Sequence, residues 1–138
     1  MSATTTTLTD EQIFKATRDC IEAWNSLDVE ATLATYTDDV VYSDPKTRGK
    51  IVGKDDLRRY LTKFFKVWDM QFTVVEEYRL VGQDAQLCMW ECKIRHRSGG
   101  EAITLNGMDI CGVRGNQLCR DEAFMDTLPL EPLLAAHR

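Results

Sequence analysis

The chain has 138 residues, a formal net charge of −5 and a pI near 5.0, so it is long enough for one hydrophobic core and too short for two full domains. Lysines and arginines alternate with acids instead of gathering in a basic stripe, which argues against a nucleic-acid partner. No apolar run approaches a membrane span, and the Ser/Thr-rich start lacks the apolar core of a signal peptide, so we expect a cytoplasmic protein without a membrane partner.

The five cysteines, at positions 20, 88, 92, 111 and 119, are odd in number and contain no Cys-x-x-Cys pair. This pattern predicts neither a disulfide framework nor a zinc site, and the thiols are expected to act as small core residues. Histidines, cysteines and acids do not share the sequence spacing of metal ligands. We therefore expect neither a metal nor a cofactor.

Two helices are expected near the N-terminus, after a disordered tail over residues 1–8. Thr9 and Gln12 form a capping box ahead of apolar residues at helical spacing, which predicts an amphipathic first helix. Asp28 can cap a shorter second helix that runs through Tyr36, with the Tyr36 ring facing inward. Residues 9–138 are expected to form a single domain.

The segment that follows is expected to change from helix to strand and to stop at an acid. Val40 and Tyr42 are good strand formers, and Pro45 biases Asp44 away from helix. Val40, Tyr42 and Asp44 then share one face of the strand. If that face lines a pocket, Asp44 is a carboxylate beside a phenol and can act as a general base. The alternative is a solvated acid, because Asp before Pro is also ordinary turn chemistry.

A third helix is expected after a polar loop over residues 45–53. It begins at Lys54, and Asp55 and Asp56 are well placed for the positive end of its dipole. Its predicted apolar face consists of Leu57, Tyr60, Leu61, Phe64, Phe65 and Trp68.

From Met70 onward the hydrophobic period becomes alternating and predicts a meander of four strands, at about residues 70–80, 85–97, 101–113 and 117–126. In the third of these strands Asp109 lies on the same face as Gly107 and Cys111. A buried acid there must be paired or protonated, and a protonated acid donates a hydrogen bond instead of bearing charge. The tail from Thr127 is expected to cover a sheet edge. Three helices on this curved sheet predict an α+β cone.

The order of these elements resembles the nuclear transport factor 2-like superfamily, over about residues 10–127. The resemblance rests mainly on the segment from Tyr36 to Gly53 with the helix after it, and on the strand that contains Asp109. Within the superfamily the chain is most similar to ketosteroid isomerases and SnoaL-like cyclases. This implies a curved, mixed or antiparallel sheet wrapped around a pocket. It also implies that Asp44 is the proton-transferring base and Asp109 the acid that donates to the oxyanion.

The chain departs from the isomerase pattern at two aromatic positions. The oxyanion tyrosine of the isomerases aligns with Cys20, and one of two supporting tyrosines aligns with Leu61, while Tyr36 keeps the other. A thiol is a weaker donor than a phenol, so Tyr42 is considered as a substitute donor.

Five further side chains complete the predicted binding site. Asp121 lies two residues before Ala123, which aligns with the last-strand acid of the epoxide hydrolases, and it keeps an acid on the same face. The aromatic residues either line a ligand cavity or form ordinary core. These are Trp24, Tyr60, Phe64 and Trp90.

The predicted function is a cofactor-independent isomerase or cyclase that abstracts a proton alpha to a carbonyl of a small apolar molecule, such as a steroid-, polyketide- or enone-like compound. A non-catalytic ligand-binding or dimerisation module on the same fold is the alternative. Epoxide hydrolase-like and dehydratase-like chemistry fit less well, because the long strand has no Arg-x-Asp pair and the only histidines are His96 and His137. The enzyme interpretation requires a cavity that both Asp44 and Asp109 line. We also expect a homodimer through the outer sheet face, where Met108 and Ile110 lie opposite to Asp109.

Overall fold

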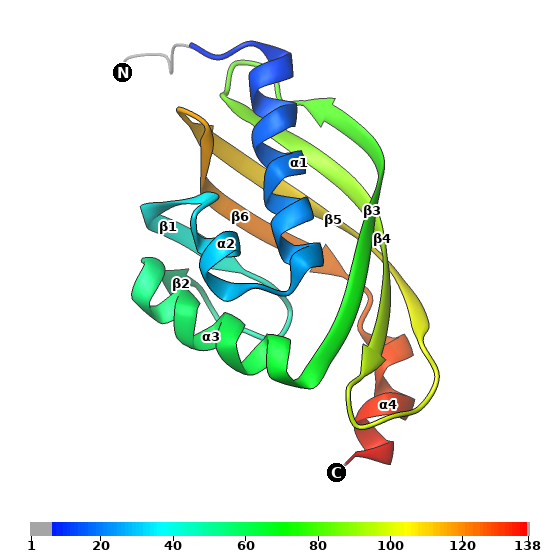
Figure 1. The fold of residues 1–138 in the computed structure, drawn as a ribbon. Helices are drawn as coiled ribbons and strands as arrows, with labels where there is room; N and C mark the ends of the chain where they lie inside the picture. The colour runs from blue at the N-terminus through cyan, green and yellow to red at the C-terminus, as the bar shows by residue number, and fades with distance from the viewer. Residues whose placement is uncertain (1–6, 138) are drawn as a thin grey trace.

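The computed structural model describes residues 7–137 of the chain (Figure 1). The predicted tail over residues 1–8 lies outside the described residues, except for Thr7 and Leu8, whose backbone N–H groups both donate to the Asp84 carboxylate. In chain order the elements are α1 (Asp10–Ser26), α2 (Val29–Leu33), β1 (Tyr36–Ser43), β2 (Ile51–Val52), α3 (Lys54–Val67), β3 (Trp68–Arg79), β4 (Ala85–His96), β5 (Ile103–Arg114), β6 (Gln117–Met125), the 3₁₀ turn η1 (Leu128–Leu130) and α4 (Glu131–Ala136).

The six strands form one curved sheet in the order β2-β1-β6-β5-β4-β3. The predicted meander is confirmed, because β3, β4, β5 and β6 pair antiparallel in sequence. β1 joins this meander by pairing parallel with β6, which makes the sheet mixed. The helices α1, α2 and α3 lie on one face of the sheet (Figure 1). The fold is therefore the predicted α+β architecture.

Helix α1 begins at the predicted capping box. The Thr9 hydroxyl accepts from the Gln12 N–H, and the Gln12 side chain accepts from the Thr9 N–H. The helix ends at Leu27, whose left-handed φ of 56° directs the chain away from the helix axis. One face of α1 is buried against the sheet and carries Thr17, Cys20 and Trp24.

The predicted extent of the second helix was wrong, because α2 ends at Leu33 and β1 already begins at Tyr36. Parallel pairing explains the difference. Tyr36 is the register partner of Leu118, and the Leu118 N–H donates to the Thr35 carbonyl. These tertiary hydrogen bonds outweigh the weak local preference of a five-residue helix to continue.

Two other segments also differ from the expectation. The predicted polar loop contains β2, in which Ile51 and Val52 pair with Tyr42 and Val41 of β1. The C-terminal tail forms η1 and α4, and η1 contacts β5, an interior strand, instead of covering a sheet edge. Leu130 and Leu133 bury their side chains there, so apolar burial positions this segment.

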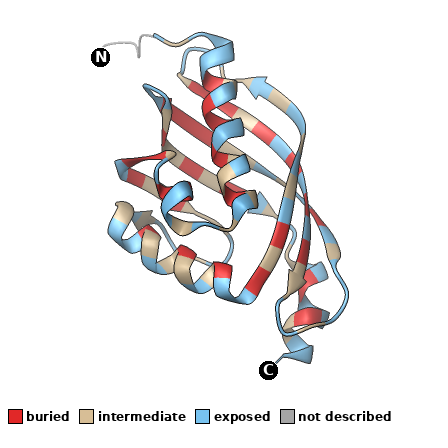
Figure 2. Ribbon diagram, viewed as in Figure 1, coloured by how far each residue is buried: buried red, intermediate tan, exposed pale blue. Residues whose placement is uncertain are grey.

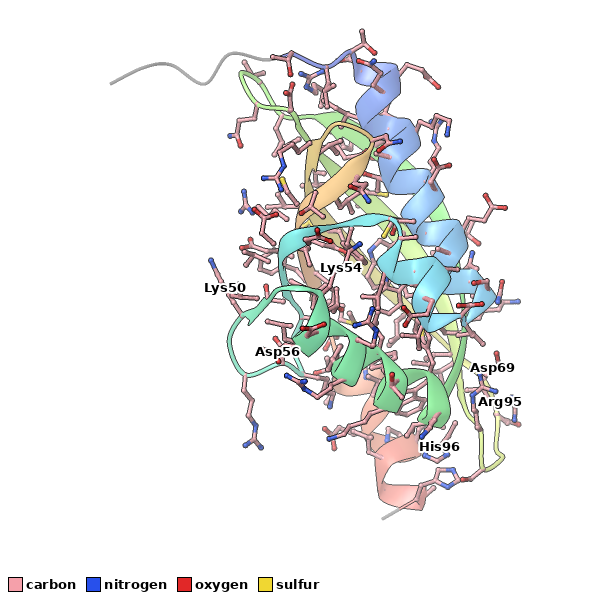
Figure 3. The ribbon with its side chains drawn as sticks, turned by 60° about the vertical axis from the view of Figure 1, so that its left-hand side comes forward. Lys50, Lys54, Asp56, Asp69, Arg95 and His96 are labelled. Carbon is pink, nitrogen blue, oxygen red and sulfur yellow. The ribbon has the colours of Figure 1, made fainter. Side chains whose placement is uncertain are left out.

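Buried residues face the space between the helices and the sheet (Figure 2). All five cysteines are free; four are buried and Cys119 is half-buried. Charged side chains project outward, including Lys50, Lys54 and Asp56 near α3 and the Asp69–Arg95 ion pair at the end of the β3–β4 ladder (Figure 3). Among the described residues, no helix is long and apolar enough to cross a membrane.

Candidate active site

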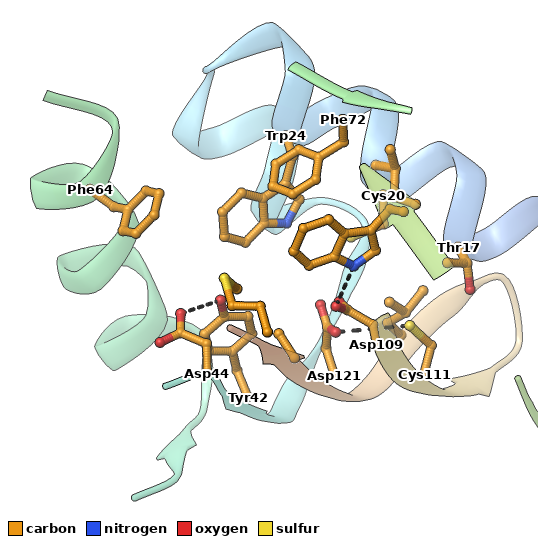
Figure 4. A pocket seen from close by; sticks show the side chains of 15 residues that line it. Thr17, Cys20, Trp24, Tyr42, Asp44, Phe64, Phe72, Asp109, Cys111 and Asp121 are labelled. Carbon is orange, nitrogen blue, oxygen red and sulfur yellow. Dashed lines mark hydrogen bonds between the residues drawn. The ribbon is translucent and has the colours of Figure 1, made fainter. Parts of the chain in front are cut away.

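Two neighbouring cavities lie between the helices and the sheet. The inner chamber has a volume of about 60 Å³ and is lined by side chains of α1, α3 and all the long strands from β1 to β6 (Figure 4). The outer chamber, of about 270 Å³, extends from α3 to the C-terminal segment. Both are lined by the side chains that form a neck between them: Asp44, Phe64, Phe72, Trp90 and Met125. The interior is therefore open to a small ligand.

Asp44 lies at this neck, directly after β1. Its Oδ2 accepts hydrogen bonds from the Tyr42 hydroxyl, at 2.7 Å, and from the Tyr60 hydroxyl, while its Oδ1 accepts from the Lys46 N–H at 2.7 Å. Burial, followed by the Asp44 charge, raises the pKa of Tyr42 and of Tyr60, so both phenols remain protonated donors. Three donors thus fix the orientation of the carboxylate toward the cavity.

A second acidic group lies deeper in the inner chamber, where the carboxyl groups of Asp109 and Asp121 point toward one another (Figure 4). Asp121 is opposite Cys111 in the register and Asp109 is opposite Ala123, so the two acids are diagonal neighbours on adjacent strands. Asp121 is 3% exposed. Burial raises its pKa well above the ordinary value, and the nearby charge and hydrogen bond of Asp109 raise the pKa further. We call these two residues the acid pair. The site therefore favours a protonated Asp121 that lies beside Asp109.

Aromatic side chains hold the acid pair in place. The Tyr36 hydroxyl donates to Asp121 Oδ2 at 2.6 Å and accepts from the Trp24 indole N–H at 3.0 Å. The Trp90 indole N–H donates to Asp109 Oδ1 at 2.8 Å. Burial, followed by the Asp121 charge, raises the pKa of Tyr36 well above its ordinary value, so this phenol remains a donor. Each carboxyl therefore has its own neutral donor.

A glycine makes room for the Trp90 ring. Trp90 and Gly107 are register partners on β4 and β5. A Cβ atom at position 107 would lie 2.5 Å from Cη2 of Trp90 and 2.9 Å from the Phe124 carbonyl oxygen. The indole can therefore cross β5 and reach Asp109 only because position 107 has no side chain.

All nine site residues predicted from the sequence line one of the two chambers. Tyr60 lines the outer chamber. The other eight line the inner chamber: Cys20, Trp24, Tyr42, Asp44, Phe64, Trp90, Asp109 and Asp121.

The roles considered for two of them need correction. Tyr42 directs its hydroxyl at Asp44 and is not a free donor for a substrate oxygen. The fully buried acid is Asp121, whereas Asp109 is only partly buried. Among residues 7–137, neither histidine lines either chamber. Sequence reasoning missed Thr17 and Phe72, although Thr17 has helical spacing to Cys20 and Trp24.

The residues best placed to hold a metal ion are Asp109, Cys111 and Asp121, whose ligand atoms lie within 4.8 Å of one another. The spacing of the sequence could not indicate this group, because Asp121 comes from the next strand. A metal would require a thiolate at Cys111, and burial raises the pKa of this thiol well above its ordinary value. Protonation of Asp121 is thus the simpler way to reduce the negative charge of this cluster.

Comparisons with known proteins identify relatives of the fold. The family model of the SnoaL-like domain matches residues 17–120. A suspected isomerase from Bacillus subtilis is similar in structure, with a TM-score of 0.82, 15% identity and coverage of 91% of this chain and 94% of that chain. A suspected polyketide cyclase from Xanthomonas campestris pv. campestris has a TM-score of 0.74 and 17% identity, with coverage of 91% of this chain and 96% of that chain. A ketosteroid isomerase-like protein from Erwinia carotovora atroseptica has a TM-score of 0.64 and 22% identity, with coverage of 85% of this chain and 98% of that chain. A search of curated proteins finds no match.

The first prediction concerns the protonation of Asp121. The pKa of Asp121 is higher in the folded protein than the unfolded value of about 4. The stabilisation that the protonated Asp121 gives is therefore complete below about pH 4 and is lost as the pH rises through the folded pKa. Asp121→Asn mimics the protonated acid. We expect the variant to match the wild type near pH 4 and to exceed it by about 1 kcal/mol or more at pH 8, measured by urea unfolding.

Asp38→Asn is the matched control, because the Asp38 side chain is fully exposed. Its unfolding free energy should stay within about 0.5 kcal/mol of the wild type, because the ion pair of Asp38 with Lys54, at 3.6 Å, is solvated at the Asp38 end. An Asp121→Asn variant that is destabilised equally at pH 4 and pH 8 would contradict a protonated Asp121 in the folded protein.

The second prediction concerns Gly107. The added methyl group of Gly107→Ala must displace the Trp90 ring, so we expect a loss of about 1–3 kcal/mol in unfolding free energy and altered tryptophan fluorescence. Trp90→Phe in the same chain should restore part of this stability, since it removes the ring atoms that clash. Gly107→Ala with unchanged stability and fluorescence would show that the close packing of this pair is unimportant.

Proposed function

Because this chain belongs to the SnoaL-like domain family, we propose that it is a cofactor-independent isomerase or cyclase acting on a carbon acid. One observation carries the proposal: Asp44 and the acid pair line the same inner chamber, so a base and a hydrogen-bond donor face one small ligand. In this mechanism Asp44 removes a proton alpha to a carbonyl, and the acid pair stabilises the resulting enolate.

The role of Asp44 as base follows from its position at the neck. Its carboxylate is held by Tyr42, Tyr60 and the Lys46 N–H. The two phenols occupy both lone pairs of Oδ2, whereas Oδ1 retains one lone pair for a substrate proton. The bond from the alpha carbon to hydrogen breaks, its electrons form the enolate, and Asp44 holds the proton. Returning that proton to a different carbon completes an isomerisation, and attack of the enolate carbon on an electrophile closes a ring.

The acid pair replaces the missing tyrosine of the isomerases. Burial raises the pKa of Cys20, so the residue at that position is a protonated thiol and a weak donor. The proton of the Asp121 carboxyl is the stronger donor in the chamber, and it can move toward the substrate oxygen as negative charge develops there. The sequence suggested an oxyanion role for Asp109 alone, and the proposal extends this role to Asp121.

The expected rate enhancement limits the substrates. A positioned general base contributes about 10²–10⁴ and an oxyanion donor about 10²–10³ in rate. These factors suffice for activated carbon acids such as enones or β-dicarbonyl compounds. The outer chamber is lined by aromatic and aliphatic side chains, including Tyr60, Trp68 and Leu130, which suits an apolar polyketide- or steroid-like body. A cytoplasmic location belongs to the same proposal, since all five thiols are free.

The third prediction tests the base. Exchange of the alpha protons of 2-tetralone in deuterated buffer, followed by NMR, reports proton abstraction without requiring the natural substrate. We expect Asp44→Asn to lose about 10²-fold or more of the protein-dependent exchange rate. Cys20→Ser, the matched control in the same chamber, should lose little.

Retention of full exchange by Asp44→Asn would refute the proposed base. If the wild type binds apolar ketones but accelerates no exchange, the alternative of a non-catalytic binding module is preferred.

We further propose that the protein forms a homodimer through the outer sheet face. Met89, Met108 and Phe124 are successive register partners across β4, β5 and β6, and they expose 38%, 38% and 47% of their surfaces. Val75 on β3 extends this apolar row. Such a row gains free energy when a second copy covers it.

The fourth prediction follows from this row. Light scattering at micromolar concentration should give twice the chain mass of 15.8 kDa. Met108→Lys should shift the protein to the monomer, because it places a charge in the centre of the row. Val81→Lys, at a hairpin position that is 97% exposed, is the control and should remain dimeric. A monomeric wild type would exclude the proposed interface.

A further inference from the structure

Thr17 is a buried polar residue that the mechanism above does not use. It is 2% exposed, and within the described part of the chain its hydroxyl oxygen has no hydrogen-bond partner. The side chain lines the inner chamber. A buried hydroxyl without a partner is costly, and it therefore indicates that a polar atom of a ligand occupies this end of the chamber.

The position of Thr17 relative to the base follows from the helix. Thr17, Cys20 and Trp24 lie on one face of α1, and seven residues of helix place Thr17 about 10 Å from Trp24. Trp24 packs against two rings of the neck: its ring centre lies 6.1 Å from that of Phe64 and 6.0 Å from that of Phe72. Thr17 and Cys111 lie at the end of the chamber opposite Asp44 and Phe64 (Figure 4). The acid pair lies between these two ends.

We propose that the inner chamber is a subsite for two neighbouring oxygen atoms of the substrate. The first oxygen is the carbonyl or enolate oxygen at the acid pair, and the second is a hydroxyl or carbonyl oxygen at Thr17. The substrate class is then a neutral, flat compound with two adjacent oxygens at its buried end, such as an alpha-hydroxy ketone or its enediol. This inference deepens the proposed function and rests on it.

The chemistry of the lining residues supports a neutral ligand of this kind. A threonine hydroxyl both donates and accepts, so it can bind either a hydroxyl or a carbonyl oxygen. Asp44, Asp109 and Asp121 face the same chamber, so a carboxylate or phosphate on the ligand would be repelled. Phe72 and Trp90 lie edge to face with ring centres 5.0 Å apart and present aromatic surface to the body of the ligand, which suits a flat, apolar compound.

Two aromatic alcohols test the subsite, because a phenol resembles the enol form of a ketone. 2-Naphthol carries one oxygen, and 2,3-dihydroxynaphthalene carries two adjacent oxygens on the same flat body. Calorimetry under reducing conditions gives both affinities. We expect the wild type to bind the diol about tenfold more tightly, as for one additional hydrogen bond.

Variants of Thr17 show whether its hydroxyl causes the preference for the diol. Thr17→Val keeps the shape and removes the hydroxyl, so the affinity ratio should fall to about one, and Thr17→Ser should retain most of it. Unliganded Thr17→Val should melt at or above the wild-type temperature, because it loses an unpaired buried hydroxyl.

Three results would overturn the subsite: a wild type that does not prefer the diol or binds neither alcohol, a Thr17→Val variant that keeps the preference, or an unliganded Thr17→Val that is strongly destabilised. The binding experiment does not depend on turnover. A diol preference without any exchange of 2-tetralone protons would refute the proposed catalysis and leave the subsite standing. Exchange of 2-tetralone protons without a preference for the diol would refute the subsite and leave the proposed catalysis standing.

Discussion

The structure depends on how one carboxyl group, that of Asp121, is accommodated inside an apolar core. An ionised carboxylate at this depth would lose most of its hydration, so the group must be protonated or paired. The protein provides both: Asp109 lies within hydrogen-bonding reach, and the Tyr36 hydroxyl donates to Asp121 Oδ2. Because the Trp24 indole orients that phenol in turn, α1, β1 and β6 are tied together at the same point.

Strand register makes this arrangement possible. Asp109 and Asp121 meet only because Cys111 is opposite Asp121 in the β5–β6 ladder, and a slip of one residue would turn either acid to the outer face. The parallel pairing of β1 with β6 places Tyr36 beside the acid pair and brings Asp44 to the neck of the cavity. Asp44 and the acid pair thus face one chamber without lying adjacent in the sequence.

The sequence predicted the parts that depend on local pattern. Alternation placed Asp109 on the inner face of its strand, and Pro45 together with strand-forming neighbours placed Asp44 at a strand end. The contact between Asp109 and Asp121 could not be predicted, because it depends on the register of two strands. The strand at Tyr36 was missed for a related reason, since its partner Leu118 is distant in sequence. Thr17 was missed although its spacing places it on the face of Cys20 and Trp24, because threonine on a helix face usually bonds to its own backbone.

The central claim is that the inner chamber holds a carboxyl group that stays protonated at neutral pH. A carbon-13 NMR titration of the aspartate side-chain carboxyls, with the Asp121 resonance assigned from Asp121→Asn, tests it most directly. Burial raises the pKa of Asp121, so we expect its resonance to remain at the protonated position at pH 7 and to move only at higher pH. A resonance that moves fully near pH 4 would contradict the account, because the chamber would then contain a charged acid and no donor for the substrate oxygen.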